Sequence, residues 1–158
     1  MEYISPGDFS GKLTAFTYPD EFDEVNGIFG PSPAPGLYIH DQPPKSFGLS
    51  YRTKIGDDLV GVEAGYRIHL LYNVLANPDS QEYSTLGESG SDPSEFSWTL
   101  SAKPVTGAGS WRPTAHVSID SREVDPSLLE TFEGLIYGTV STNPYLPTLN
   151  YVYDVFVP

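Results

Sequence analysis

The residues whose types could support catalysis or metal binding are three histidines and many carboxylates, and cysteine is absent. His40, His69 and His116 are too far apart for any two of them to share one helix or strand at the spacing of metal ligands. Without cysteine the chain has no thiolate metal site, disulfide or cysteine nucleophile. A histidine site assembled from distant strands stays open as an alternative. The residue pattern by itself predicts no metal site and no cofactor.

The nucleophile and phosphate motifs of common enzymes are also missing. Ser50 is followed two residues later by Arg52, where the elbow of a serine hydrolase needs glycine. The glycine-rich turn at 107–110 lacks the downstream lysine of a phosphate-binding loop, and no helix is predicted after it. With 21 acidic residues, some carboxylates lie near one another by chance, so no glycosidase pair stands out. We therefore predict that the protein is not an enzyme.

The charge is strongly negative, because 21 acidic residues oppose 8 basic ones for a formal net charge of −13. So few bases cannot build the basic patch that nucleic-acid binding needs. An acidic protein can still lie beside DNA where its task is to let DNA pass without adhering. No apolar run approaches the length of a membrane span, and no basic, apolar leader opens the chain. We expect a soluble protein without membrane contact.

Alternating apolar and polar residues predict that most of the chain forms β-strands. The stretch 46–75 is predicted to be two antiparallel strands joined by an acidic, glycine-bearing loop. The same alternation predicts further strands at 9–18, 96–102, 115–119 and 148–157. With 15 glycines and 15 prolines for turns, the composition favours an all-β fold with one flanking α-helix. The length of 158 residues fits a single domain over 1–158.

One helix is predicted at about 126–137. Asp125 stands at the N-cap, a proline follows at the first helical position, and Gly138 ends the helix. Apolar residues repeat on one stripe of this helix at Leu128, Leu129, Phe132, Leu135 and Ile136. We expect the stripe to pack on the sheet near Leu71 and Leu75, where the second strand of the central pair is apolar on both faces.

Two long segments, 26–44 and 76–94, are predicted to be loops from their proline and turn-forming residues. Five prolines exclude 26–44 from the interior of a sheet, yet this segment carries apolar residues that must pack either under the loop itself or against another subunit. The predicted terminal strand 148–157 is likewise apolar on nearly both faces. We therefore expect contacts between subunits at Ile28, Phe29, Leu37, Tyr38, Ile39, Tyr83, Tyr151 and Tyr153.

The central stretch also carries a family resemblance. The runs F-G-L-S-Y-R-T at 47–53, G-D-D at 56–58 and G-Y-R-I-H-L-L-Y at 65–72 resemble the signature of the major tail tube proteins of long, non-contractile-tailed bacteriophages. Further runs match in the same order: T-A-F-T-Y-P-D-E-F at 14–22, F-S-W-T-L at 96–100, K-P-V-T-G at 103–107, P-T-A-H-V-S-I-D-S at 113–121, L-L-E-T-F-E-G-L-I-Y-G at 128–138 and L-P at 146–147. The resemblance covers most of the chain from about residue 9 to 147.

The resemblance implies a β-sandwich, a barrel-like tail-tube fold, whose subunits form stacked hexameric rings around a channel. It implies that the partners are copies of this chain and other phage tail proteins, and that DNA passes without specific binding. The implied localisation is the virion tail, assembled in the host cytoplasm. Asp57, Asp58 and Glu63, in the loop between the central strands, are the candidates for acids that face the channel. Turn chemistry alone is the other explanation of that loop.

A second hypothesis is a monomeric β-sandwich that binds carbohydrate or another virion component through Trp98, Trp111 and its tyrosine-rich surfaces. Members of the tail tube family carry a further N-terminal stretch, whereas here only residues 1–13 precede the match that begins the series. A shortened tube protein, a tail-tip protein and a role outside the tail stay open as alternatives. The oligomeric state distinguishes a tube subunit from a monomeric binding module.

Overall fold

The computed structural model describes residues 8–29, 34–57, 61–79 and 95–157, apart from the side chains at 57, 62 and 63. The fold is mostly antiparallel β-structure with flanking α-helices, which confirms the predicted all-β class. The chain divides into two compact units. The helix-bearing unit contains Gly48–Asn73 and Lys103–Pro158, and the loop-bearing unit contains Phe9–Phe47 and Val74–Ala102. A single folding domain over the whole chain stays a prediction.

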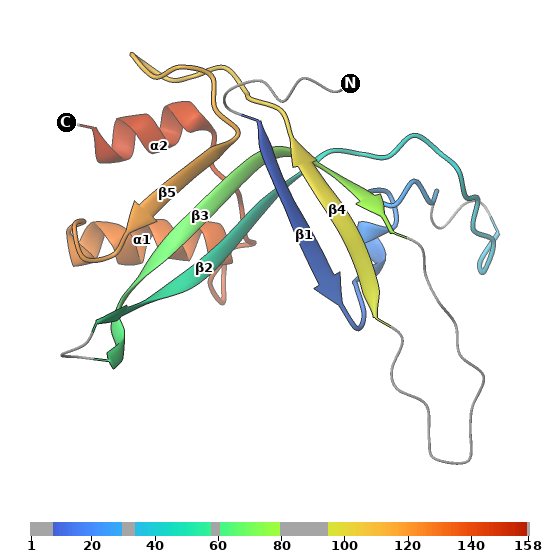
Figure 1. Cartoon of the computed structure of the whole chain (residues 1–158), viewed down its shortest axis with the longest axis horizontal. Coiled ribbons are helices and arrows are strands. Elements are labelled where there is room, and N and C mark those ends of the chain that lie inside the picture. Colours follow the sequence, from blue (N-terminus) through green and yellow to red (C-terminus); the bar gives the residue numbers. More distant parts are fainter. Residues whose placement is uncertain (1–7, 30–33, 58–60, 80–94, 158) are drawn as a thin grey trace. The chain divides into compact units, whose positions relative to one another are not determined.

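Strands account for most of the regular structure, and Figure 1 labels them with the two α-helices. In chain order the elements are β1 (Phe9–Ala15), a 3-10 helix (Asp20–Phe22), β2 (Phe47–Asp57), β3 (Gly61–Pro78), β4 (Phe96–Ala102), β5 (His116–Asp120), α1 (Pro126–Tyr137) and α2 (Leu149–Phe156). The two strands predicted over 46–75 correspond to β2 and β3, which confirms that part of the sequence interpretation.

The long strand β3 changes its pairing partner along its length. Its middle pairs antiparallel with β5, with Leu71 opposite His116. Its end, 74–78, pairs antiparallel with β4, and β4 in turn pairs with β1. Asn73, between the two pairings, has a positive φ of 51°. Asparagine tolerates this left-handed conformation better than most residues, so the backbone can adopt it here without a glycine.

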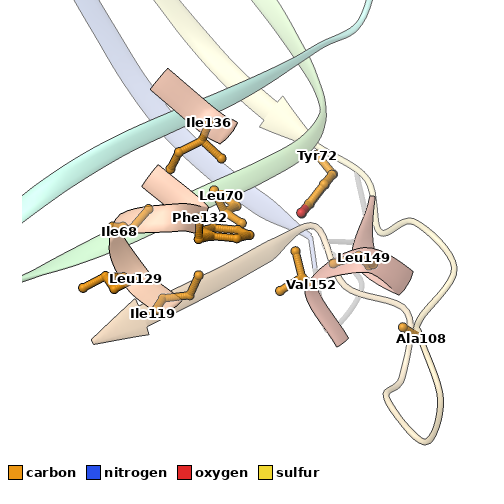
Figure 2. Close-up of a cluster of buried hydrophobic side chains, with 10 residues drawn as sticks. All are labelled: Ile68, Leu70, Tyr72, Ala108, Ile119, Leu129, Phe132, Ile136, Leu149 and Val152. Atoms are coloured by element: carbon orange, nitrogen blue, oxygen red, sulfur yellow. The ribbon is translucent and has the colours of Figure 1, made fainter. Parts of the chain in front are cut away.

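The core of the helix-bearing unit lies between one face of β3 and β5 and the two helices (Figure 2). Ile68, Leu70 and Tyr72 alternate along β3 and all belong to this core, because every second side chain of a strand points to the same face. The remaining buried members are Ala108, Ile119, Leu129, Phe132, Ile136, Leu149 and Val152. Both helices therefore cover the same face of the sheet, and this face is the one that β3 fills with apolar residues.

The helix α1 spans the range that its capping residues predict. The Asp125 carboxylate accepts hydrogen bonds from the backbone N–H groups of Ser127 at 3.0 Å and Leu128 at 3.1 Å. Gly138 ends the helix with φ 76°, a conformation that favours glycine. The predicted stripe is buried at Leu129, Phe132 and Ile136 and half-buried at Leu128 and Leu135. The sequence interpretation is thus right about both the position of this helix and its buried face.

Two details of the predicted packing and loops differ from the structure. The core under α1 is formed by Ile68 and Leu70 of β3, and neither Leu71 nor Leu75 belongs to it. The neighbouring side chains of a strand point to opposite faces, which is why one step along β3 moves a residue out of the helix-covered core. The segment predicted as loop 76–94 is strand at its beginning, because β3 continues to Pro78. Residues 80–94, including the expected contact residue Tyr83, lie outside the described residues.

The predicted strand at 148–157 is wrong, because these residues form α2. The side chain of Thr148 caps the helix by accepting a hydrogen bond from the backbone N–H of Tyr151 at 3.3 Å. Leu149 and Val152, nearly one helical turn apart, are buried in the core. In a run this rich in apolar residues, the alternation of a strand and the 3.6-residue period of a helix fit the same letters. Packing against the rest of the unit therefore decides between them.

The loop-bearing unit is built around Trp98 of β4, which is 2% exposed. The rings of Tyr18 and Phe22 meet the indole at steep angles, with centroids 5.6 Å and 5.3 Å away. The indole N–H donates a hydrogen bond to the side-chain oxygen of Asn26 at 2.6 Å. A buried indole needs such a polar partner. This bond also fastens the turn that carries Asn26 to the strand β4.

Candidate functional site

The segment 26–44 exposes four of its apolar side chains and does not pack them under the loop. Phe29 and Ile39 form an isolated antiparallel bridge, in which the Phe29 N–H donates to the Ile39 carbonyl at 2.8 Å. The exposed fractions are 59% for Phe29, 50% for Leu37, 51% for Tyr38 and 43% for Ile39. These four residues are called the apolar arm below. Ile28 was expected to share this surface, but its side chain is half-buried and so is less exposed than the side chains of the arm.

Backbone and charged contacts hold the base of the apolar arm. The Gln42 N–H donates to the Gly27 carbonyl at 2.9 Å, and the Lys45 N–H donates to the Glu24 carbonyl at 3.0 Å. The Lys45 ammonium also pairs with the Glu24 carboxylate at 2.6 Å. Gly27 has φ 71°, and a Cβ at this position would clash with the Gln42 carbonyl, so only glycine fits. The arm therefore presents its apolar side chains from a base that is fixed.

A cleft of about 910 Å³ lies in the loop-bearing unit, lined by residues that include Tyr18, Phe96 and Asp79. The Asp79 carboxylate accepts hydrogen bonds from the hydroxyls of Ser97 at 2.9 Å and Thr99 at 3.1 Å. These two bonds hold the pKa of Asp79 below its ordinary value. A carboxylate that stays ionised and already accepts two hydrogen bonds is a poor proton donor. The carboxylate of Asp79 thus serves to link two strands at the edge of this cleft, which His40 and Asp41 also line.

The two tryptophans named in the second hypothesis belong to different units, and neither is fully exposed. Trp98 is buried in the loop-bearing unit, where its N–H is already used. Trp111 is half-buried in the helix-bearing unit and packs edge-to-face with Tyr153, with ring centroids 5.0 Å apart. Sugar binding relies on the open face of an aromatic ring. Because the Tyr153 ring packs against Trp111, it is already engaged inside its own unit. Tyr151 is 46% exposed, so its side chain is available for a contact between subunits.

The helix-bearing unit brings together two histidines that the sequence did not connect. His69 of β3 and His116 of β5 face each other, with Nδ1 of His69 2.9 Å from Nε2 of His116. The other ring nitrogen of His69, Nε2, is 2.9 Å from the Thr53 hydroxyl of β2. Tyr51 stacks on the His69 ring with centroids 4.6 Å apart and planes 9° apart. The two histidines meet because of the register between β3 and β5, and the sequence alone does not predict this register.

The ionisation of these histidines is biased towards the neutral form. The pKa of His69 is lowered by desolvation in the sheet, then by the neighbouring His116 and by the charge of Arg67. The pKa of His116 is lowered by desolvation as well. Arg67 itself pairs with the Asp120 carboxylate at 2.9 Å, which offsets its charge. At neutral pH the two facing rings are therefore uncharged imidazoles, each with one nitrogen lone pair.

A second polar cluster joins α1 to the sheet. The Arg52 guanidinium of β2 pairs with the Glu133 carboxylate at 2.9 Å. It also lies over the rings of Tyr66 and Tyr137, 4.7 Å from each centroid. The Tyr66 hydroxyl donates to the second Glu133 oxygen at 2.6 Å, and this bond raises the pKa of Tyr66. All of these groups satisfy one another, so the cluster positions the helix and leaves no group aimed at a ligand.

The acids expected to face a channel are not placed by the structure. Asp57 ends β2 and Glu63 lies near the start of β3, and nothing is described of their side chains. Asp58 lies outside the described residues. The assignment of these three acids to a channel stays a prediction. In the parts of the chain that the structure describes, no helix is long and apolar enough to cross a membrane, and no three histidine or acidic side chains gather as metal ligands.

Comparison of the chain with protein-family models, with curated proteins and with solved structures finds no match in any of the three. The sequence runs and the geometry described above therefore carry the functional argument.

Proposed function

We propose that the protein is a structural subunit of a phage tail tube, which assembles with copies of itself into stacked hexameric rings around a channel for DNA. The sequence runs at 47–53 and 65–72 support this through their resemblance to tail tube proteins. The apolar arm is the observation that carries the proposal. Its three consecutive residues Leu37, Tyr38 and Ile39 are exposed although a hydrogen-bonded base holds the segment. Contiguous exposed apolar groups of this kind are typical of surfaces that another protein covers.

The ends of the pairing order give a second line of support. The strands pair in the order β1-β4-β3-β2, with β5 paired to β3 outside this order, so β1 and β2 stand at the two ends of the order. Among the described strands, each of these two has one side without a neighbour in that order. An edge strand offers backbone N–H and C=O groups that a strand of another chain can pair with. Subunits of this kind can continue their sheets from one copy to the next around a ring.

The charge fits both the assembly and the channel. Copies that each carry a formal net charge of −13 repel one another, so apolar contacts must overcome this repulsion when a ring forms. Salt screens such repulsion over about 10 Å at 0.1 M. We therefore expect rings to form more readily as salt is raised. Carboxylates around the channel would repel DNA phosphates as well, which lets a polyanion slide without adhering.

Light scattering coupled to size exclusion, followed by negative-stain imaging, tests the proposal. The wild-type chain should form rings or tubes whose fraction rises between 50 and 500 mM sodium chloride, because the Debye length falls from about 14 Å to about 4 Å over this range. The double variant Leu37→Ser with Tyr38→Ser should stay monomeric while keeping its circular dichroism spectrum. Val140→Ser is the matched control, because Val140 is a fully exposed apolar residue outside the arm. This control should assemble like the wild type.

Two outcomes would contradict the proposal. A wild-type chain that stays monomeric at every salt concentration and at hundreds of micromolar protein is not a tube subunit. Equal loss of assembly in the arm variant and in the Val140 control would show that general surface polarity, and not the arm, controls association.

A further inference from the structure

We propose that the cleft of the loop-bearing unit is a binding site for a short, neutral oligosaccharide. The inference concerns one unit of one chain, so it is independent of the proposed assembly into a tube. The cleft volume of about 910 Å³ lies within the range of roughly 300–1,000 Å³ that is typical of small-molecule sites. A second hollow of about 390 Å³ shares Tyr18, Ile28, His40 and Phe96 with it. The two hollows adjoin at these side chains, so a ligand of several linked rings can occupy both.

A hydrogen bond at the base of the cleft orients one of its amides. One wall is formed by the turn at 26–28 with the segment 40–44, and the other by the end of β3 and the start of β4. The buried indole of Trp98 donates its N–H to the side-chain oxygen of Asn26 at 2.6 Å. The NH₂ group of Asn26 is not bonded to any of the described residues. This amide therefore has a fixed orientation and two N–H donors left for a ligand.

The other polar groups that line the cleft also suit hydroxyl groups, which both donate and accept hydrogen bonds. The amide of Gln42 donates to the His40 carbonyl at 3.0 Å, which leaves its oxygen as an acceptor. Asn77 adds a third, exposed amide. Each oxygen of Asp79 accepts one hydroxyl of β4, and a carboxylate offers about four acceptor positions, so it can accept further hydroxyls.

Two aromatic rings give the cleft an apolar surface on which a sugar ring can pack. Tyr18 and Phe96 meet edge to face with centroids 5.1 Å apart, and both are half-buried. Phe96 also stacks beside Trp98, with planes 13° apart and centroids 5.9 Å apart. These contacts hold the rings in place. The C–H face of a sugar can lie against them while its hydroxyl groups reach the amides, which is the usual division between apolar lining and a few polar groups.

The charges at the cleft disfavour an anionic ligand. Among the described residues that line it there is no lysine or arginine, whereas Asp41 and Asp79 both do. The Lys12 ammonium is 3.5 Å from the Asp79 carboxylate and offsets part of this charge. A sugar that carries a carboxylate or phosphate would bring a further negative charge close to these acids. The cleft therefore selects neutral sugars over charged ones.

An array of neutral di-, tri- and tetrasaccharides, followed by calorimetry with the tightest binder, tests the site on the full-length chain at low salt. We expect one saccharide per chain. Asn77→Ala should weaken binding about fivefold and Asp79→Asn about tenfold, because each removes a hydrogen bond to the sugar. Asn143→Ala is the matched control, because Asn143 is an exposed amide of the helix-bearing unit. Its dissociation constant should stay within twofold of the wild type.

Two further measurements locate the sugar and identify its class. The side-chain NH₂ signals of Asn26 and Asn77 in nuclear magnetic resonance spectra should shift as sugar is added, and the signal of Asn143 should not. The same oligosaccharide with one unit replaced by a uronic acid should bind about tenfold more weakly, because its carboxylate meets Asp41 and Asp79. Circular dichroism of both cleft variants checks that they are folded.

Four outcomes would overturn the proposal. No neutral oligosaccharide of the array binds at about 10 mM, or Asn77→Ala and Asp79→Asn both bind within twofold of the wild type. The resonance shifts are confined to the helix-bearing unit. Spermidine binds more tightly than every saccharide and loses affinity in Asp79→Asn, which would make the cleft a site for an organic cation held by its acids and aromatic rings.

Discussion

Each compact unit buries an aromatic ring almost completely, but the two rings lie in different surroundings. In the helix-bearing unit, Phe132 packs among aliphatic side chains and against the ring of Phe156, with centroids 5.0 Å apart. In the loop-bearing unit, Trp98 is equally buried, but it packs among rings and depends on a hydrogen bond to Asn26. One unit therefore draws its order from two helices laid on a sheet. The other packs aromatic rings around Trp98 and holds its turns with separate hydrogen bonds.

This difference in packing explains why one unit buries its apolar residues and the other leaves some of them exposed. Helices satisfy their own backbone groups, so they can turn an apolar stripe inwards and close a core. A proline-rich segment cannot join a sheet or a helix and is held by scattered hydrogen bonds, which leaves its apolar side chains outside. The apolar arm is the result. The following predictions are ordered from the largest expected effect to the smallest, and each tests this contrast between the units.

Removing the ring at the centre of the helix-bearing unit should have the largest effect. Phe132→Ala should lower the free energy of unfolding by about 3–5 kcal/mol, because the side chain is 2% exposed and a cavity remains in its place. Urea denaturation followed by circular dichroism measures the loss. A change below about 1 kcal/mol would show that α1 does not close this core.

Breaking the polar contact of the loop-bearing unit should cost less. Trp98→Phe should lower the free energy of unfolding by about 1–3 kcal/mol, because it removes the N–H and leaves the half-buried Asn26 oxygen without its donor. Combining it with Asn26→Ala in a double-mutant cycle isolates the bond. The two effects should be less than additive. Full additivity would mean that the hydrogen bond does not hold the turn.

Acid should weaken the helix-bearing unit through its facing histidines. Their pKa values are lower in the folded chain, so the unfolded chain takes up protons first as the pH falls below about 6.5. Stability is therefore unchanged at higher pH and decreases as the pH falls through this range, until the folded histidines also become protonated. The thermal midpoint in metal-free buffer should fall between pH 7 and pH 5.5. The double variant His69→Asn with His116→Asn should lose most of this dependence, and an unchanged slope would contradict the assignment.

Changing the apolar arm should have the smallest effect on the isolated subunit. Leu37→Ser with Tyr38→Ser should alter the free energy of unfolding by no more than about 0.5 kcal/mol per site, because both side chains are half exposed to solvent. The measurement is urea denaturation at a protein concentration where the wild type is monomeric. A loss approaching that of Phe132→Ala would show that the arm is part of a core and not a contact surface.

The sequence by itself determined the elements whose signals are local. The helix 126–137 was found because an N-cap aspartate, a following proline and a terminal glycine act within a few residues of one another. The central strands were found from the alternation of their side chains. The composition also indicates the all-β class and keeps 26–44 out of the interior of a sheet, because prolines restrict the backbone wherever they stand.

Only the tertiary structure decided what depends on partners distant in the chain. The run 148–157 fits a strand or a helix, and packing under the sheet selects the helix α2. Trp98 and Asn26 are 72 positions apart, and His69 and His116 are 47 apart. Each pair meets through strand register and turn packing, which are set by the summed contacts of whole elements. A pattern read along a single chain carries the preferences of each strand, but it does not carry the register that brings two strands side by side.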